Sequence, residues 1–250
     1  MMKTFKVVVL AVLLSGCVPT EKITKGKSEL SAEIKIVNIN LEHKLNSKQK
    51  ARKLAEEIVQ SGSEIVFLQQ VLEPKPGSDD FNAIKFLAKE LDWNYYFGMA
   101  RFYEGQNSGN AILSLFPIQQ RIIHSLPTVK GKVRKAITFG VIDIGLRAIS
   151  CGSTEFDNEN KIERVQQAKS LNNYFKKIDN NLILIGGSFY LKKEEKGSDI
   201  LNENFKTNDL NLRDEISIFV SKSEKISVDS FENFETPVGF GKISKIKIKQ

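Results

Sequence analysis

Apolar residues along this chain occur in short continuous runs and in stripes with helical spacing. The most compact run, residues 182–185, lies between two asparagines and two glycines. A continuous run of this length is typical of a strand that is buried on both faces. The glycines predict a close turn, and loops that follow such strands commonly carry functional groups. This loop offers Ser188, Phe189 and Tyr190, with neither a carboxylate nor an imidazole.

The same criteria predict eight further strands and three helices. The strands are rich in Ile, Val and aromatic residues, and they are expected at residues 33–40, 64–71, 93–98, 110–116, 135–144, 146–151, 215–221 and 241–249. Stripes with a spacing of three or four positions predict helices at residues 49–60, 81–91 and 162–177. Residues 42–47 and 101–108 are expected to be polar loops, and residues 191–210 show no clear pattern. This order predicts one domain of sheets with helices outside.

The N-terminus has a different pattern from the rest of the chain. Lys3 and Lys6 accompany an apolar run at residues 7–14. This run is shorter than the roughly 20 residues that span a bilayer, and it has the length of a signal-peptide core. It ends in LSGC at residues 14–17, which follows the pattern of a bacterial lipobox, in which cleavage precedes the cysteine and the cysteine is acylated. An ordinary secretory signal with a chance cysteine is the alternative.

The sequence therefore predicts a signal peptide at residues 1–16, a lipidated N-terminus and flexible tether at residues 17–31, and one domain at residues 32–250. The expected partner is a lipid membrane, reached through acylated Cys17. The expected location is the bacterial cell envelope, at a membrane whose identity and face the sequence leaves open. Cys151 is the only other cysteine, so no intramolecular disulfide is expected.

The charge of the chain favours a solvated basic surface. The net charge is +7, from 37 basic and 30 acidic residues, and the lysines are dispersed. The densest basic stretch contains Lys130, Lys132, Arg134 and Lys135, in a predicted loop. Nucleic-acid binding through this surface is the less favoured interpretation, because a solvated turn explains the same residues.

Several short motifs occur in an order that points to one family. The clearest is GNAILS at residues 109–114, followed by FPI at residues 116–118. IVFLQQV at 65–71 resembles I-V-x-L-Q-E-V, NIN at 38–40 resembles T-x-N, and GSFY at 187–190 stands where G-D-F-N belongs. This order resembles the endonuclease/exonuclease/phosphatase superfamily over about residues 34–248. The resemblance implies an α+β fold, a four-layer α/β/β/α sandwich of two packed mixed sheets with flanking helices.

The resemblance also implies metal-dependent hydrolysis of phosphate esters, but most of the residues that would carry it are changed. Such chemistry needs a hard cation such as Mg²⁺ held by carboxylate oxygen. The family's first asparagine is kept as Asn40, whereas the glutamate of L-Q-E-V is Gln70. The histidine of T-H-L falls at Gly152, and the Asp and Asn of G-D-F-N are Ser188 and Tyr190. The histidine, aspartate and asparagine that the family's reaction needs at these positions are therefore absent from this sequence.

Two more family positions are altered near the C-terminus. The aspartate before the late strand falls near Ile216, with Asp214 two residues away. The motif S-D-H has no counterpart, because residues 237–242 contain neither an acid nor a histidine. His43 and His124 are the only histidines, and neither lies in a segment that could supply the missing pair.

Two interpretations follow. The favoured one is a non-catalytic lipoprotein whose domain binds an unknown protein or an anionic ligand, without a metal or another cofactor. Arg101 and Asn110 would then hold a phosphate or another anion, although Asn40 and Asn110 could equally be structural hydrogen-bonding residues at strand ends. The alternative is a Mg²⁺-dependent phosphodiesterase or phosphatase with surrogate ligands. It requires two acids to converge with Asn40, from the set Glu42, Glu104, Glu155, Asp157 and Asp214.

Overall fold

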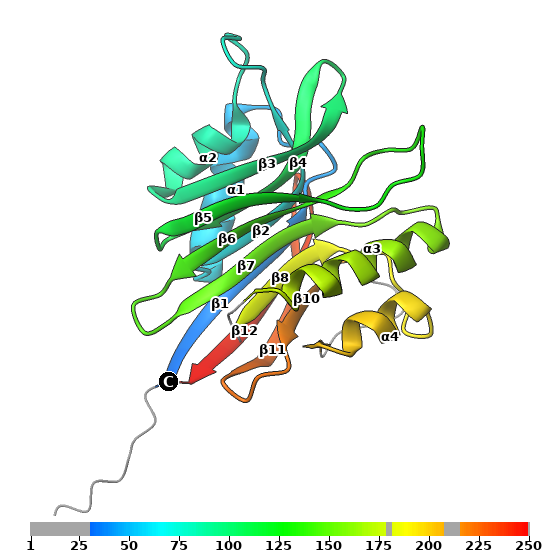
Figure 1. The fold of residues 1–250 in the computed structure, drawn as a ribbon. Helices are drawn as coiled ribbons and strands as arrows, with labels where there is room; N and C mark the ends of the chain where they lie inside the picture. Colours follow the sequence, from blue (N-terminus) through cyan, green and yellow to red (C-terminus); the bar gives the residue numbers. More distant parts are fainter. Residues whose placement is uncertain (1–30, 179–181, 208–215, 250) are drawn as a thin grey trace, which may run out of the picture.

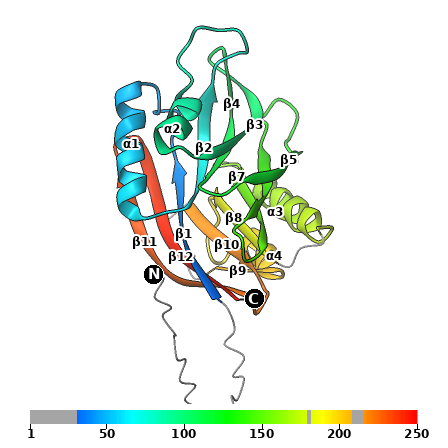
Figure 2. The ribbon, with the colours of Figure 1, turned by 90° about the vertical axis from the view of Figure 1, so that its left-hand side faces the viewer.

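The structure is a computed structural model that describes residues 31–178, 182–207 and 216–249. Two six-stranded mixed sheets pack face to face, and helices cover the outer face of each sheet (Figure 1, Figure 2). Helices α1 (Lys48–Ser61) and α2 (Ala83–Leu91) lie on the first sheet. Helix α3 (Lys161–Phe175) and the short helix α4 (Lys196–Asn202) lie on the second. The predicted four-layer α/β/β/α sandwich is confirmed.

Each sheet contains one parallel pair of strands at its centre. The first sheet has the order β11-β12-β1-β2-β4-β3, with strands Ile226–Thr236, Gly239–Lys249, Ser31–Asn40, Ile65–Glu73, Gln106–Ser114 and Asn94–Tyr103. The second has the order β5-β6-β7-β8-β10-β9, with strands Ile118–Ser125, Ala136–Asp143, Ala148–Glu155, Ile183–Ser188, Ile216–Ser221 and Phe205–Lys206. The parallel pairs are β1–β2 and β7–β8, so the carboxyl ends of the two strands in each pair lie at the same edge.

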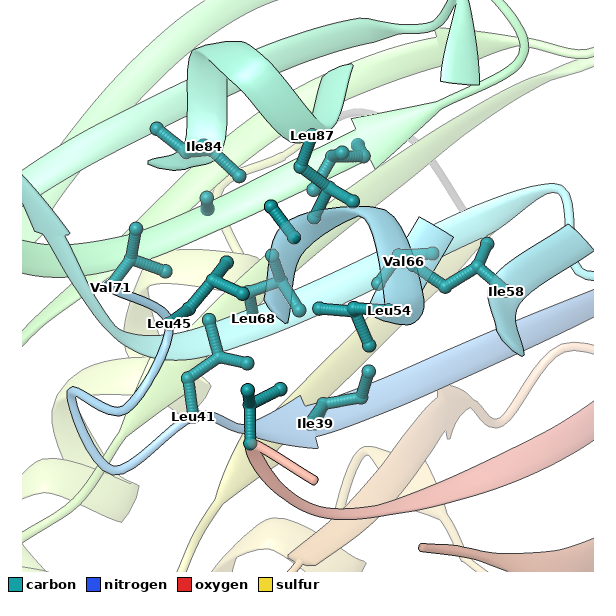
Figure 3. Close-up of a cluster of buried hydrophobic side chains, with 14 of the residues drawn as sticks. Ile39, Leu41, Leu45, Leu54, Ile58, Val66, Leu68, Val71, Ile84 and Leu87 are labelled. Atoms are coloured by element: carbon teal, nitrogen blue, oxygen red, sulfur yellow. The ribbon is translucent and has the colours of Figure 1, made fainter. Parts of the chain in front are cut away.

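The helical layers follow from the apolar stripes and from the caps. Leu54 and Ile58 of α1 pack with Ile84 and Leu87 of α2 against Leu68 and its neighbours on β1 and β2 (Figure 3). The side chain of Ser47 accepts a hydrogen bond from the Lys50 amide at the start of α1, and Gly62 ends the helix with φ 67°. These are the usual signals for the two ends of a helix.

Some predicted elements were wrong or missing, and they include a hairpin, two edge strands and the region after β8. Residues 101–108 were expected to form a loop, but β3 and β4 continue through them and only Glu104 and Gly105 turn, with φ of 47° and 82°. Strands β5 and β11 were not predicted, because much of each lies exposed at or near a sheet edge and so lacks an apolar pattern. The unpatterned region 191–210 contains α4 and β9.

The space between the sheets changes in character along its length. Near Ser31 and Lys249, which pair across β1 and β12, it is filled with isoleucines and leucines. Toward the carboxyl ends of β1, β2, β7 and β8 it is filled with amides, hydroxyls and charges. We call this second region the polar end, defined by Asn38, Asn40, Gln69, Gln70, Arg101, Lys135, Ser153, Glu155, Ser188 and Tyr190.

Candidate anion site at the polar end

A fully buried amide network joins the two sheets at the base of the polar end. Asn38 donates from Nδ2 to the backbone oxygens of Gly187 and Ser217, at 3.1 and 3.2 Å. Its Oδ1 accepts a hydrogen bond from Nε2 of Gln69 at 2.8 Å. Gln69 Nε2 also reaches Ser153 Oγ at 3.0 Å. These side chains are inaccessible to solvent, so they cannot contact a ligand. Their role is to fix the positions of the strand ends.

A bulge in β2 directs two consecutive side chains to the opposite sheet. Gln70 has φ 53°, and the pairing of β2 with β4 shifts register between Leu68 and Val71. Without the bulge, Gln69 and Gln70 would point to opposite faces. With it, Gln69 bonds to Ser153, and Gln70 donates from Nε2 to Glu155 Oε1 at 3.0 Å. The backbone irregularity therefore places Gln70 in the site.

Glu155 is the centre of the polar end. It lies at the carboxyl end of β7 and is 5% exposed. Lys135, also 5% exposed, places Nζ 2.7 Å from Glu155 Oε1. Arg101 places Nη1 3.4 Å from Glu155 Oε2. One carboxylate is thus bound directly by two cations and one amide.

Burial and charge oppose each other at Lys135. Burial lowers the pKa of Lys135 below its ordinary value, and the negative charge of Glu155 acts in the opposite direction. The charge of Arg101 lowers the pKa of Lys135 further, whereas the negative charge of Asp157 raises it. The ammonium of Lys135 is retained in the interior by its contact with Glu155.

Asn40 and Tyr190 form the rim of the site. Asn40 Nδ2 donates to the hydroxyl of Tyr190 at 3.2 Å, and Asn40 Oδ1 accepts from the Glu42 amide at 3.1 Å. Tyr190 follows β8 with φ 51°. Ser188 is fully buried below it, with Oγ 3.5 Å from Gln69 Oε1. Asn40 and Tyr190 therefore contact each other across the two sheets, whereas Ser188 belongs to the buried network.

His43 extends the rim on the side of β4. Its Nε2 lies 3.0 Å from Ser108 Oγ, and its ring stacks on Tyr103 with a centroid distance of 4.1 Å. Burial is the main cause that lowers the pKa of His43, and the positive charge of Arg101 adds to it. A neutral imidazole is favoured in this position.

The comparisons with known proteins agree with this architecture. The sequence matches the family model "PGAP2IP, C-terminal nuclease-like domain" over residues 27–217, more than half of the chain.

The chain belongs to this family.

Solved structures of the endonuclease/exonuclease/phosphatase superfamily share the fold of this PGAP2IP-like domain. The family member from Beutenbergia cavernae DSM 12333 is 13% identical with a TM-score of 0.69, covering 86% of this chain and 72% of that chain. The human nocturnin catalytic domain with bound sulfate is 14% identical with a TM-score of 0.66, covering 88% and 97%. The mannosyl-6-phosphatase Bt3783 of Bacteroides thetaiotaomicron VPI-5482 is 13% identical with a TM-score of 0.67, covering 85% and 99%. No curated protein matches significantly. The predicted superfamily is confirmed.

The donors at the polar end of this PGAP2IP-like domain do not fit a divalent cation. Such a cation takes carboxylate oxygens as ligands, but Glu155 already binds Lys135 and Arg101. Asp157 Oδ1 accepts from the backbone amides of Glu159 and Asn160. Glu42 pairs with Lys44, and Glu104 lies in the β3–β4 turn. Within the part of the chain that the structure describes, no three acids, histidines or cysteines cluster as a metal site.

Several predicted site residues lie elsewhere. Gly152 is in the middle of β7 and faces the helical layer, since a Cβ there would lie 2.6 Å from Ile137 and 3.5 Å from Phe175. Glu155, three residues later, occupies the strand end. Ile216 begins β10, and Asp214 and Cys17 lie outside the described residues. His124 stacks on Tyr174 of α3, remote from the polar end.

Asn110 bonds to the backbone of a neighbouring strand and is not available to bind an anion. It is 1% exposed, and its Nδ2 donates to the Ala136 backbone oxygen at 2.8 Å. Its Oδ1 has no hydrogen-bond partner among the described residues, and an acceptor repels an anion. Of the predicted anion pair, only Arg101 lies in the site.

Sequence reasoning did not recognise the central ion pair. Lys135 was noted only for its basic neighbours, and Glu155 only as a surrogate metal ligand. Thr154-Glu155-Phe156 lies at the end of β7 and shortly before α3. The sequence predicted a strand that ends at residue 151, whereas β7 continues to Glu155, so the sequence did not place Glu155 at the strand end.

Proposed function

We propose that this protein is a membrane-anchored lipoprotein whose domain binds an anionic ligand without cleaving it. The observation that carries the proposal is the pairing of Glu155 with Lys135 and Arg101. Protein cations here contact the carboxylate that would otherwise be available to a metal. Glu155, engaged by these cations, is not available to hold a metal that would activate water for attack on a phosphate ester.

The same residues favour an anion as ligand. Two cations, Arg101 and Lys135, directly contact the single carboxylate of Glu155, so this cluster of three groups has a net charge of about +1. Arg101 has further guanidinium donors, and its side chain is 14% exposed. The Tyr190 hydroxyl and the Asn40 amide, which contact each other, form the rim of the same polar end. A phosphate, sulfate or carboxylate would accept hydrogen bonds from these groups.

The position of the site is compatible with an N-terminal lipid anchor. β1 has 10 residues and runs from Ser31 to Asn40 (Figure 2). At about 3.3 Å per residue this is about 33 Å. The polar end is therefore at the opposite end of β1 from Ser31, and a lipid on Cys17 is compatible with access to it. Among the described residues, no helix is long and apolar enough to cross a bilayer.

Calorimetric titration with Mg²⁺, Mn²⁺ and inorganic phosphate, together with a phosphodiester hydrolysis assay on the same sample, tests the binding role. We expect phosphate binding that Arg101→Gln weakens, with neither metal binding nor turnover. Arg52→Gln is the matched control, because Arg52 is an exposed arginine on α1. Metal binding accompanied by turnover that Asn40→Ala abolishes would establish the phosphodiesterase alternative instead.

Fractionation of cells that express the protein tests the anchor separately. Cys17→Ala should move the protein out of the membrane fraction and abolish incorporation of a labelled fatty acid. Cys151→Ala is the control, because Cys151 is buried in the domain and unavailable for acylation. Unchanged membrane association and labelling in Cys17→Ala would refute the lipoprotein assignment while leaving the binding role intact.

A further inference from the structure

A basic pocket lies next to the anion site. It has a volume of about 590 Å³ and is formed by Met99 and Ala100 of β3 and by residues of the segment that joins β5 to β6. Four cations line it, Lys130, Lys132, Arg134 and Lys135, and no acidic residue does. We call this the β3–β6 pocket. Its volume is in the range of small-ligand sites, about 300–1,000 Å³.

Three of these cations have no counter-charge among the residues that the structure describes. Lys130, Lys132 and Arg134 are exposed, and within the described part of the chain none of them is within ion-pair distance of an acid. The next residue, Lys135, is buried against Glu155. A short segment thus holds three unneutralised charges around a concave surface, where a ligand with several negative charges would be attracted.

The β3–β6 pocket and the anion site are adjacent along two segments. Lys135 lines the pocket and contacts Glu155. On β3, Ala100 lines the pocket, and the next residue, Arg101, contacts Glu155. The register of β3 with β4 shifts between Met99 and Arg101, so a bulge lies where the two sites meet. A ligand could therefore contact Arg101 with one anionic group and the loop cations with another.

We propose that the β3–β6 pocket and Arg101 together bind a compact organic phosphate that carries two or more phosphate groups. This inference rests on the proposed function, because it names the class of anion that the domain binds. The pocket lining contains no aromatic residue. Base stacking, which supports binding of single-stranded nucleic acid, therefore has no platform there, and a phosphorylated sugar or polyol fits the lining better.

Calorimetry on the full chain in detergent tests the proposal, with fructose 1,6-bisphosphate and fructose 6-phosphate as matched probes. We expect the bisphosphate to bind at least tenfold more tightly. The triple variant Lys130→Ala/Lys132→Ala/Arg134→Ala should remove most of this preference. The control triple Lys48→Ala/Lys85→Ala/Lys89→Ala removes the same charge from exposed positions at α1 and α2, and it should change the affinity by less than twofold.

The outcomes separate this inference from the proposed function. Equal affinity for the two probes, or equal losses in the two triple variants, would overturn the bisphosphate pocket even if Arg101→Gln still abolished phosphate binding. Release of phosphate from a bound bisphosphate would contradict the non-catalytic role but retain the pocket. Tighter binding of a single-stranded oligonucleotide, or displacement of the bisphosphate by cardiolipin added to the micelles, would also overturn it.

Discussion

The two ends of the space between the sheets both contain buried side chains, but they are held together in different ways. Near Ser31 the layer contains aliphatic side chains such as Ile34, Ile36 and Ile246. At the polar end it contains amides, hydroxyls and an ion pair, and the groups at its base bond to one another. Aliphatic packing tolerates changes of similar volume, whereas a buried polar network requires each partner. The comparison predicts that the aliphatic layer responds mainly to loss of volume, whereas the polar end responds to loss of a single bonding partner.

The largest effect is expected in the aliphatic layer. Phe67 is fully buried between the sheets, and a Cβ on Gly186 would come against its ring. Phe67→Ala should lower the free energy of unfolding by about 3–5 kcal/mol, because it leaves a cavity. Chemical denaturation measures this, and Phe67→Leu should cost less. Equal effects of the two substitutions would show that the layer repacks around the cavity.

The next effect distinguishes the ion pair from simple packing. Lys135→Met leaves Glu155 buried with only Arg101 as a cationic partner, and it should cost about 3 kcal/mol, at the low end for a broken buried pair. Adding Glu155→Gln removes the uncompensated charge and keeps an acceptor for Gln70. The double variant should regain much of the lost stability in urea denaturation. A double variant that is less stable than Lys135→Met would show that the unpaired charge of Glu155 is not the cause of the lost stability.

A smaller loss is expected in the buried amide network. Gln69→Leu leaves Asn38 Oδ1 and Ser153 Oγ without their amide donor. Unsatisfied buried groups of this kind cost about 1–3 kcal/mol. Gln60→Leu, at an exposed position of α1, is the control and should change stability little. An equal effect of the two substitutions on the urea midpoint would remove the distinction between the polar and apolar ends.

The smallest effect is a dependence on pH. Burial lowers the pKa of His43 below the ordinary value of 6.5, so below that value the unfolded chain binds more protons than the folded one. Stability is therefore fully present above about 6.5 and declines as the pH falls. Denaturation at pH 7.5 and pH 5 should show this decline, and His43→Gln should reduce it. Burial lowers the pKa of His124 as well, so His124→Gln should remove a separate share. Identical curves for His43→Gln and the unmodified protein would exclude His43.

Much of the fold could be predicted from the sequence, because buried elements impose their own pattern. The run at residues 182–185 lies within the buried strand β8, and the three long helical stripes formed α1, α2 and α3. The order of the family motifs predicted the four-layer α/β/β/α sandwich. Exposed strands such as β5 could not be predicted this way, because a strand with few buried side chains does not need alternating apolar residues.

The sequence by itself determined which residues stand in the motif segments, among them Gln70, Ser188 and Tyr190. The tertiary structure decided which side chains surround them. Lys135, Arg101 and Glu155 are separated by 20 residues or more along the chain, and they meet only because the start of β6 lies near the carboxyl ends of β3 and β7. The bulge at Gln70 likewise depends on pairing with β4. Contacts between distant segments depend on sheet order and register, and no local pattern of side chains records them.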